Sequence, residues 1–269
     1  MDNRPIGIFD SGLGGLTCLT ALKKLLPGED LIYFGDTGRM PYGSKTREQV
    51  RIMAVQNLEF MAEQNCKAVI AACGTVSGNA PDILKKFRIP AFGVVEPAAE
   101  RTVRIPGSRP VAVVATEASI RSKGFENTLK ALGEKREIIS VSCPEFVPLI
   151  EEGKKSSDAE IQKAVETALS GIKGKVPCAL ILGCTHYGII EKAISDFLGN
   201  DISIISASVC AAEAAAEKLQ SADLLSNSKN GGSISFITSG KKSVFESLGS
   251  TLLGFAIEGY VTEISPAEV

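Results

Sequence analysis

The sequence contains no tryptophan and a single histidine, His186, so a site built from several imidazoles is excluded. Its seven cysteines are an odd number without a C-x-x-C pair, which disfavours a disulfide framework or a zinc knuckle. Neither sign of charge dominates, because 29 Lys and Arg residues face 31 Asp and Glu residues. A net charge of -2 gives no basic surface for phosphates, so nucleic acid is not expected as a partner.

Long hydrophobic runs are also missing. The longest uncharged stretch, from Val176 to Ile190, is shorter than the roughly 20 apolar residues that span a bilayer. The N-terminal residues lead into an apolar segment at Ile6 without the pattern of a signal peptide. We therefore expect a cytoplasmic protein with no membrane partner. Its 269 residues suffice for one large domain or two of about 130 residues each.

Short apolar segments rich in Val and Ile alternate with longer segments whose apolar residues recur at helical spacing. Uniformly apolar strands are typical of buried parallel sheets, and the alternation predicts an α/β fold. The predicted strands are Ile6–Phe9, Leu31–Phe34, Ala68–Ala72, Ala91–Val95, Val111–Ala115, Ile138–Val141, Ala179–Leu182, Ile202–Ser206 and Ile234–Thr238. The predicted helices are Leu16–Leu26, Arg47–Gln64, Gly78–Lys86, Ala98–Arg104, Arg121–Leu132, Asp158–Ile172, Ile189–Leu198 and Cys210–Leu219.

Two of the strand ends are alike. The segments Ala68–Thr75 and Ala179–His186 are each an apolar strand followed by a Cys, with a Thr within the next two positions. We interpret this as an internal duplication that gives two α/β domains with mainly parallel sheets facing a shared cleft. The first domain is predicted to comprise residues 1–95 plus 209–269, and the second residues 96–208.

Polar residues at the strand ends are the candidates for chemistry, because ligands of such sheets bind beyond the carboxyl ends of the strands. The glycine-rich turn Gly12–Thr17 lacks the third glycine of a dinucleotide fingerprint, and the chain has no P-loop. Cys73 and Cys184 stand at predicted strand ends, each before a predicted helix. A free thiol has a pKa near 8.5, and a helix N-terminus stabilises its thiolate.

One thiol on each face of a substrate carbon can remove a proton from one side and return one to the other. This chemistry inverts a stereocentre and needs neither a cofactor nor a metal. Asp10 ends the first strand and His186 follows Cys184, so each can assist its neighbouring thiol. Burial as small hydrophobic residues is expected for the remaining cysteines, Cys18, Cys66, Cys143, Cys178 and Cys210.

Six segments closely resemble the glutamate racemases of the aspartate/glutamate racemase superfamily. The resemblance extends from residue 6 to about residue 250, and its first and last segments are long and specific. The segments are Ile8–Thr17, Tyr33–Thr37, Pro41–Gly43, Ala72–Thr75, Cys143–Leu149 and Leu182–Tyr187.

The resemblance implies two pseudo-symmetric α/β domains, no pyridoxal phosphate or metal, and production of D-glutamate for bacterial peptidoglycan and hence cell shape. It implies that Cys73 and Cys184 are the two bases, that Asp10 and His186 assist them, and that Glu151 or Glu152 stands near His186. The residues that it implies for substrate binding are Ser11, Pro41, Tyr42, Gly43, Gly74, Thr75, Thr116, Ser119 and Thr185.

Gly74 departs from the family pattern, which usually has Asn between this Cys and Thr. Loss of a hydrogen bond to a charged group costs about 1.5 to 3 kcal/mol, so we expect about ten- to a hundredfold weaker substrate binding. If the loop accommodates a side chain, Gly74→Asn is expected to restore the contact. A second expectation is that the space left by the missing side chain admits a different amino acid as substrate.

Three other functions remain open from the sequence. The first is racemisation of another amino acid, such as aspartate. The second is decarboxylation, which in this superfamily uses a single cysteine and is therefore disfavoured by the pair. The third is a binding protein that has lost turnover through Gly74. The expected partner is a small amino acid substrate; the sequence does not state the oligomer, for which a homodimer is the hypothesis.

Overall fold

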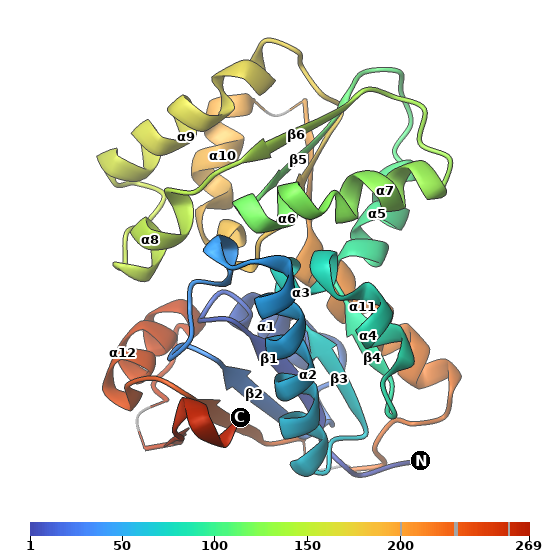
Figure 1. Cartoon of the computed structure of the whole chain (residues 1–269), viewed down its shortest axis with the longest axis vertical. Helices are drawn as coiled ribbons and strands as arrows, with labels where there is room; N and C mark the ends of the chain where they lie inside the picture. The colour runs from blue at the N-terminus through green and yellow to red at the C-terminus, as the bar shows by residue number, and fades with distance from the viewer. Residues whose placement is uncertain (200, 229–230, 258) are drawn as a thin grey trace.

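The computed structural model describes residues 1–199, 201–228, 231–257 and 259–269, and its strands form two parallel sheets with helices on both faces (Figure 1). The first sheet has the order β10-β9-β2-β1-β3-β4, with β1 at Ile6–Asp10, β2 at Leu31–Gly35, β3 at Ala68–Ala71, β4 at Ala91–Gly93, β9 at Ile234–Thr238 and β10 at Val261–Glu263. The second has the order β6-β5-β7-β8, with β5 at Val111–Ala115, β6 at Ile138–Ser142, β7 at Ala179–Leu182 and β8 at Ser203–Ser206. The predicted α/β fold class is confirmed.

The helices in the described residues cover both sheets (Figure 1). They are α1 (Leu16–Leu25), α2 (Arg47–Glu63), α3 (Gly74–Asn79), α4 (Pro81–Lys86), α5 (Val95–Val103), α6 (Glu117–Ser122), α7 (Gly124–Ala131), α8 (Phe146–Glu151), α9 (Ala159–Lys173), α10 (Glu191–Leu198), α11 (Ala207–Ser221) and α12 (Lys242–Leu253), with the 3-10 helices η1 (Tyr42–Ser44), η2 (Thr185–Ile190) and η3 (Pro266–Glu268). None of these helices has an apolar segment long enough to cross a membrane.

The central strands agree best with the sequence prediction. All residues of β1, β3, β5 and β7 are buried, as their uniformly apolar sequences predict. The expectation of two buried faces is wrong for β4, β6 and β8, which contain half-buried or exposed residues because they are edge strands. β10 was not predicted, since Val-Thr-Glu is too short and too polar to stand out.

Two predicted helices are each divided in the structure. The segment predicted over Gly78–Lys86 contains the end of α3 and all of α4, which meet at Ala80. Pro81 is the first residue of α4, where its missing N–H costs nothing. In the segment predicted over Arg121–Leu132, Lys123 has a left-handed φ of 55° and separates α6 from α7.

The two sheets are not packed independently. One apolar cluster includes Ile8 of β1 and Val113 of β5, and it continues through buried residues of α5 and α11. Helix α11 packs against both α1, which follows β1 of the first sheet, and α5, which precedes β5 of the second. The strands fall on either side of the predicted boundaries near residues 95 and 209, but the boundaries themselves stay a prediction.

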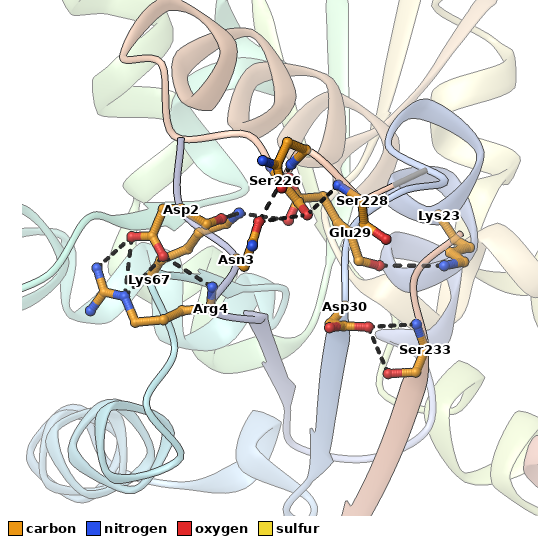
Figure 2. A network of polar contacts seen from close by, with 11 residues as sticks. Asp2, Asn3, Arg4, Lys23, Glu29, Asp30, Lys67, Ser226, Ser228 and Ser233 are labelled. Carbon is orange, nitrogen blue, oxygen red and sulfur yellow. Dashed lines mark hydrogen bonds and ion pairs between the residues drawn. The ribbon is translucent and has the colours of Figure 1, made fainter. Parts of the chain in front are cut away.

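A buried ion pair between Lys67 and Glu29 lies at one end of the first sheet (Figure 2). The candidate site residues lie at the opposite end, after the carboxyl ends of the strands. Lys67 is fully buried, and its Nζ donates hydrogen bonds of 2.6 Å to Glu29 Oε2 and to the carbonyl oxygen of Asp2. Glu29 Oε1 accepts a 2.6 Å hydrogen bond from the backbone N–H of Ser226. The pair therefore joins the N-terminal segment, the start of β3 and the backbone at Ser226, which precedes β9.

Candidate active site

Parallel pairing brings the polar strand ends together. β1 pairs with β2 and β3, so Asp10 at the end of β1 lies beside the loop that carries Cys73 after β3. In the second sheet β7 pairs with β5, which places Cys184 beside Thr116. The two cysteines are the N-caps of α3 and η2, respectively.

These ends enclose a cavity of about 120 Å³ between the two sheets. Both cysteines line it, together with most of the predicted substrate residues. Its lining consists of Ser11, Gly12, Met40, Pro41, Tyr42, Gly43, Ser44, Cys73, Gly74, Thr75, Thr116, Glu117, Cys143, Pro144, Val147, Pro148, Glu151, Cys184, Thr185 and His186. Asp10 and Ser119, which the sequence analysis also selected, lie behind this lining.

Cys184 has a buried histidine beside it. Nδ1 of His186 lies 3.7 Å from Cys184 Sγ, and Nε2 lies 2.5 Å from Oε1 of Glu151. Burial lowers the pKa of His186, but its hydrogen bonds to Cys184 and Glu151 and their negative charges raise it well above the ordinary value. The imidazole is therefore a cation at neutral pH. Of the two carboxylates that the resemblance offered, Glu151 is the partner and Glu152 is exposed.

Cys73 has different surroundings. Burial and the nearby Asp10 carboxylate raise the pKa of its thiol to about 12, although the backbone N–H of Val76 and the Ser11 hydroxyl favour the thiolate. The thiol lies 3.7 Å from Ser11 Oγ. At neutral pH Cys73 is consequently protonated in this state.

Asp10 is fully buried and braces the glycine-rich turn. Its Oδ2 accepts hydrogen bonds of 3.1 and 3.2 Å from the N–H groups of Gly12 and Gly15, and Thr185 Oγ1 donates one of 3.3 Å to Oδ1. Burial raises the pKa of Asp10, whereas the His186 charge and the two amides oppose that shift. The carboxylate thus links the first sheet to the Cys184 loop.

Hydroxyl groups connect the two sheets on the other side of the cavity. Thr75 Oγ1 and Thr116 Oγ1 are 2.9 Å apart, and Ser119 Oγ lies 2.9 Å from Thr116 Oγ1. Ser119 therefore orients the hydroxyls of Thr75 and Thr116 by hydrogen bonding, although it does not itself line the cavity.

Tyr42 is buried, and its hydroxyl belongs to a network of polar side chains around Asp36. Its hydroxyl donates to Asp36 Oδ2 and accepts a 3.2 Å hydrogen bond from Asn57 Nδ2. Arg39 Nε adds a 2.7 Å hydrogen bond to the same Asp36 oxygen, and Ser239 Oγ adds one of 2.6 Å to the other. This network fixes the loop that presents Pro41 and Gly43 to the cavity.

The space expected beside Gly74 is not empty, so the expectation of a vacated space is wrong. A Cβ atom at Gly74 would lie 1.9 Å from the carbonyl oxygen of Gly183, the residue before Cys184. The φ angle of Gly74 is not in the left-handed region, so the obstacle to a side chain is contact and not backbone strain. An Asn at this position therefore has no room in this arrangement.

Two features of the site were missed. A Cβ at Gly12 would meet Glu151 Oε1 at 2.8 Å, and one at Gly14 would meet His186 Nδ1 at 2.5 Å, so these glycines make room for the His186–Glu151 pair. The glycine-rich turn was the sequence signal for this role. Cys143, expected to be core, is indeed buried but also lines the cavity.

His186 and Glu151 also border a second cavity of about 870 Å³, which reaches Leu16 of α1 and Leu248 of α12. Within the described ranges, His, Cys, Asp and Glu side chains form no group of three or more suited to a metal ion. The expectation that neither metal nor cofactor takes part stays a prediction.

A family model of Asp/Glu/hydantoin racemases matches residues 16–215. The chain belongs to this racemase family. Its relatives include glutamate racemase 2 of Caldanaerobacter subterraneus, 39% identical over 258 residues that cover 96% of each chain.

Solved structures of racemases superpose closely. Glutamate racemase isoform RacE1 of Bacillus anthracis has a TM-score of 0.93 at 30% identity and covers 99% of both chains. Glutamate racemase of Francisella tularensis, solved in complex with D-glutamate, has a TM-score of 0.89 at 35% identity and covers 98% of both. The resemblance found in the six sequence segments is thereby confirmed.

Proposed function

We propose that this chain interconverts L- and D-glutamate, with Cys73 and Cys184 as the two acid-base groups. The observation that carries the proposal is that the two thiols come from different sheets and line one small cavity, each with its own assisting groups. The glutamate racemases among its relatives and structural neighbours support glutamate as the substrate.

The surroundings of the thiols support different starting roles. Cys184 lies beside the His186 cation and is the base that takes the α-proton of bound substrate. Cys73, whose pKa is raised to about 12, is the thiol that gives a proton to the opposite face. Glu151 keeps His186 charged and oriented, and Asp10 holds the turn and the Cys184 loop in place.

The proton balance of one turnover is closed by these groups. The Cα–H bond breaks, its proton moves to Cys184 Sγ, and the electron pair stays on Cα, delocalised into the substrate carboxylate. The S–H bond of Cys73 then breaks and its proton bonds to the other face of Cα, which inverts the centre. Cys73 is left as the thiolate and Cys184 as the thiol, ready for the reverse reaction or for exchange of protons with water.

Substrate carboxylates are held by hydroxyl and backbone N–H groups in this proposal, because the cavity lining contains neither Arg nor Lys. Ser11, Thr75, Thr116 and Thr185 supply hydroxyls around the two thiols. Fixed dipoles aimed at the carboxylate stabilise the negative charge that develops as the α-proton leaves. The D-glutamate made is a precursor of peptidoglycan, as the sequence resemblance implies.

Circular dichroism of L-glutamate incubated with dialysed, EDTA-treated protein tests the proposed activity. The signal should decay to zero as the racemate forms, with no added cofactor. L-Aspartate serves as the second substrate: faster decay with L-aspartate than with L-glutamate would overturn the substrate assignment. Binding of glutamate without proton exchange at Cα would instead select a non-catalytic binding protein.

The two-thiol assignment is tested by Cys73→Ala and Cys184→Ala. Each variant should lose racemisation, because one face of the carbon then lacks its acid or base, while its thermal unfolding remains cooperative. Cys143→Ala is the matched control, since its thiol lines the same cavity without an assisting Asp or His. More than about a tenth of wild-type turnover in either test variant, a loss of only about 1.4 kcal/mol, would contradict the assignment.

A further inference from the structure

Helix α3 and the Cys184 loop touch through their backbones, and the contact is made by Gly74 and Gly183. Gly74 directly follows Cys73, and Gly183 directly precedes Cys184. A Cβ at Gly74 would be 1.9 Å from the Gly183 carbonyl oxygen, 3.1 Å from its carbonyl carbon and 3.9 Å from Cys184 Cα. A main-chain carbonyl cannot rotate out of the way as the end of a long side chain can.

Gly183 has no space into which to retreat. Its N–H donates a 2.8 Å hydrogen bond to the carbonyl oxygen of Val114 in β5. Behind it, a Cβ at Gly183 would meet Phe125 at 2.8 Å and Ala115 at 3.1 Å. The residue is therefore held between α3 on one side and the second sheet with α7 on the other.

The start of α3 is equally constrained. The Ser77 N–H donates to the Cys73 carbonyl oxygen at 3.0 Å, and Ser77 Oγ donates to the carbonyl oxygen of Ala71 at 3.2 Å. Asn79 Nδ2 donates to the Thr75 carbonyl oxygen at 2.8 Å. Because the bond from Ser77 Oγ ties α3 to the end of β3, we expect a methyl group at position 74 to separate the two sheets and not merely to displace one loop.

We infer that Gly74 is a positioning residue that sets the separation of the Cys73 and Cys184 thiols across the substrate carbon. The inference rests on the proposed two-thiol function and adds a determinant of its geometry. Cβ atoms essentially never come within 3.0 Å of another heavy atom, so relieving the 1.9 Å contact requires the backbones to move apart by at least 1.1 Å. Misplacement of reacting groups by about 1 Å can cost about a hundredfold in rate.

Gly74→Ala tests the inference because it adds only the Cβ. Gly171→Ala in α9 is the matched control: its Cβ would have no atom within 4 Å. Racemisation of L-glutamate by Gly74→Ala should fall by about a hundredfold or more, and that by Gly171→Ala should not change. Racemisation by Gly74→Ala within about threefold of wild type would overturn the inference.

The route of the proton distinguishes a misplaced thiol from a general loss of active-site structure. In D2O, a thiol that has taken the α-proton can exchange it and return a deuteron to the same face, whereas inversion needs the opposite thiol. We therefore expect Gly74→Ala to raise the ratio of deuterium entry into unreacted L-glutamate to formation of D-glutamate. An equal fall of both rates would show a merely structural role and overturn the inference.

A crystal structure of the wild-type protein with D-glutamate keeps the inference testable if Gly74→Ala does not fold. The Gly183 carbonyl oxygen should remain in van der Waals contact with Gly74, and a water-sized gap between them would contradict the inference. Absence of glutamate racemisation by the wild-type protein would instead refute the proposed function, while this contact could still be examined.

Discussion

Glu151 Oε1 accepts a 2.5 Å hydrogen bond from Nε2 of His186, whose Nδ1 faces the Cys184 thiol. Helix α8 ends at Glu151, and the 3-10 helix after β7 carries His186, so the contact joins segments 35 residues apart. The carboxylate is one of the groups that raise the pKa of His186, which keeps a cation beside Cys184 at neutral pH.

Glu151→Gln should move the alkaline limb of the kcat/KM profile to lower pH. The amide has no charge to stabilise imidazolium, so the pKa of His186 falls and the cation is lost earlier as pH rises. Racemisation rates measured from pH 6 to 10 give the profile. Glu152→Gln is the control, because that side chain is exposed, and an unmoved limb in Glu151→Gln would contradict the role.

Tyr42→Phe should destabilise the protein by about 1 to 3 kcal/mol, because it removes the hydroxyl donor to the buried carboxylate of Asp36. The KM for glutamate should rise as well, since the same hydroxyl fixes the loop with Pro41 and Gly43. Urea unfolding and initial-rate kinetics measure the two effects. Tyr260→Phe, at a residue 71% exposed, should change neither, and equal behaviour of the two variants would disprove the bracing role.

Buried thiols should make the fold less stable above pH 9. Burial raises the pKa of Cys18 from 9.0 to about 12, so the unfolded chain releases this proton first. The contribution of the protonated Cys18 thiol to the free energy of unfolding is complete below pH 9 and is lost as pH rises towards 12. The loss is up to about 1.4 kcal/mol per pH unit for each such thiol.

Urea unfolding at pH 8, 9 and 10 measures this slope. Cys18→Ala should be less stable at every pH, with a smaller decline between pH 9 and 10, because one of the buried thiols is gone. An identical decline in wild type and variant would show that Cys18 does not contribute.

Lys67→Met should cost about 3 to 5 kcal/mol of stability, because it leaves the Glu29 carboxylate buried without its partner (Figure 2). The double variant with Glu29→Gln should recover part of the loss. Lys192→Met is the control: Lys192 is 77% exposed in its pair with Asp196, so the expected cost is below about 1 kcal/mol. Equal unfolding midpoints for the two single variants would refute the importance of the buried pair.

The sequence by itself determined the strands and the residues at their ends. Uniform apolar segments such as Val111–Ala115 and Ala179–Leu182 match strands residue for residue, because a strand buried on both faces must be apolar throughout. Parallel strands present their carboxyl ends at the same edge of a sheet. The likeness of the segments Ala68–Thr75 and Ala179–His186 predicted in addition that the two sheets face one cleft, with Cys73 on one side and Cys184 on the other.

Only the tertiary structure decided which neighbours these residues meet. It selected Glu151 over Glu152, turned Tyr42 towards Asp36, and filled the space beside Gly74 with the backbone of Gly183. Each of these contacts joins segments that are separated along the chain or depends on which way a side chain leaves its helix. A hydrophobic pattern records which face of an element is buried, but it does not record the atoms packed against that face, and the close contacts at this site are made by those atoms.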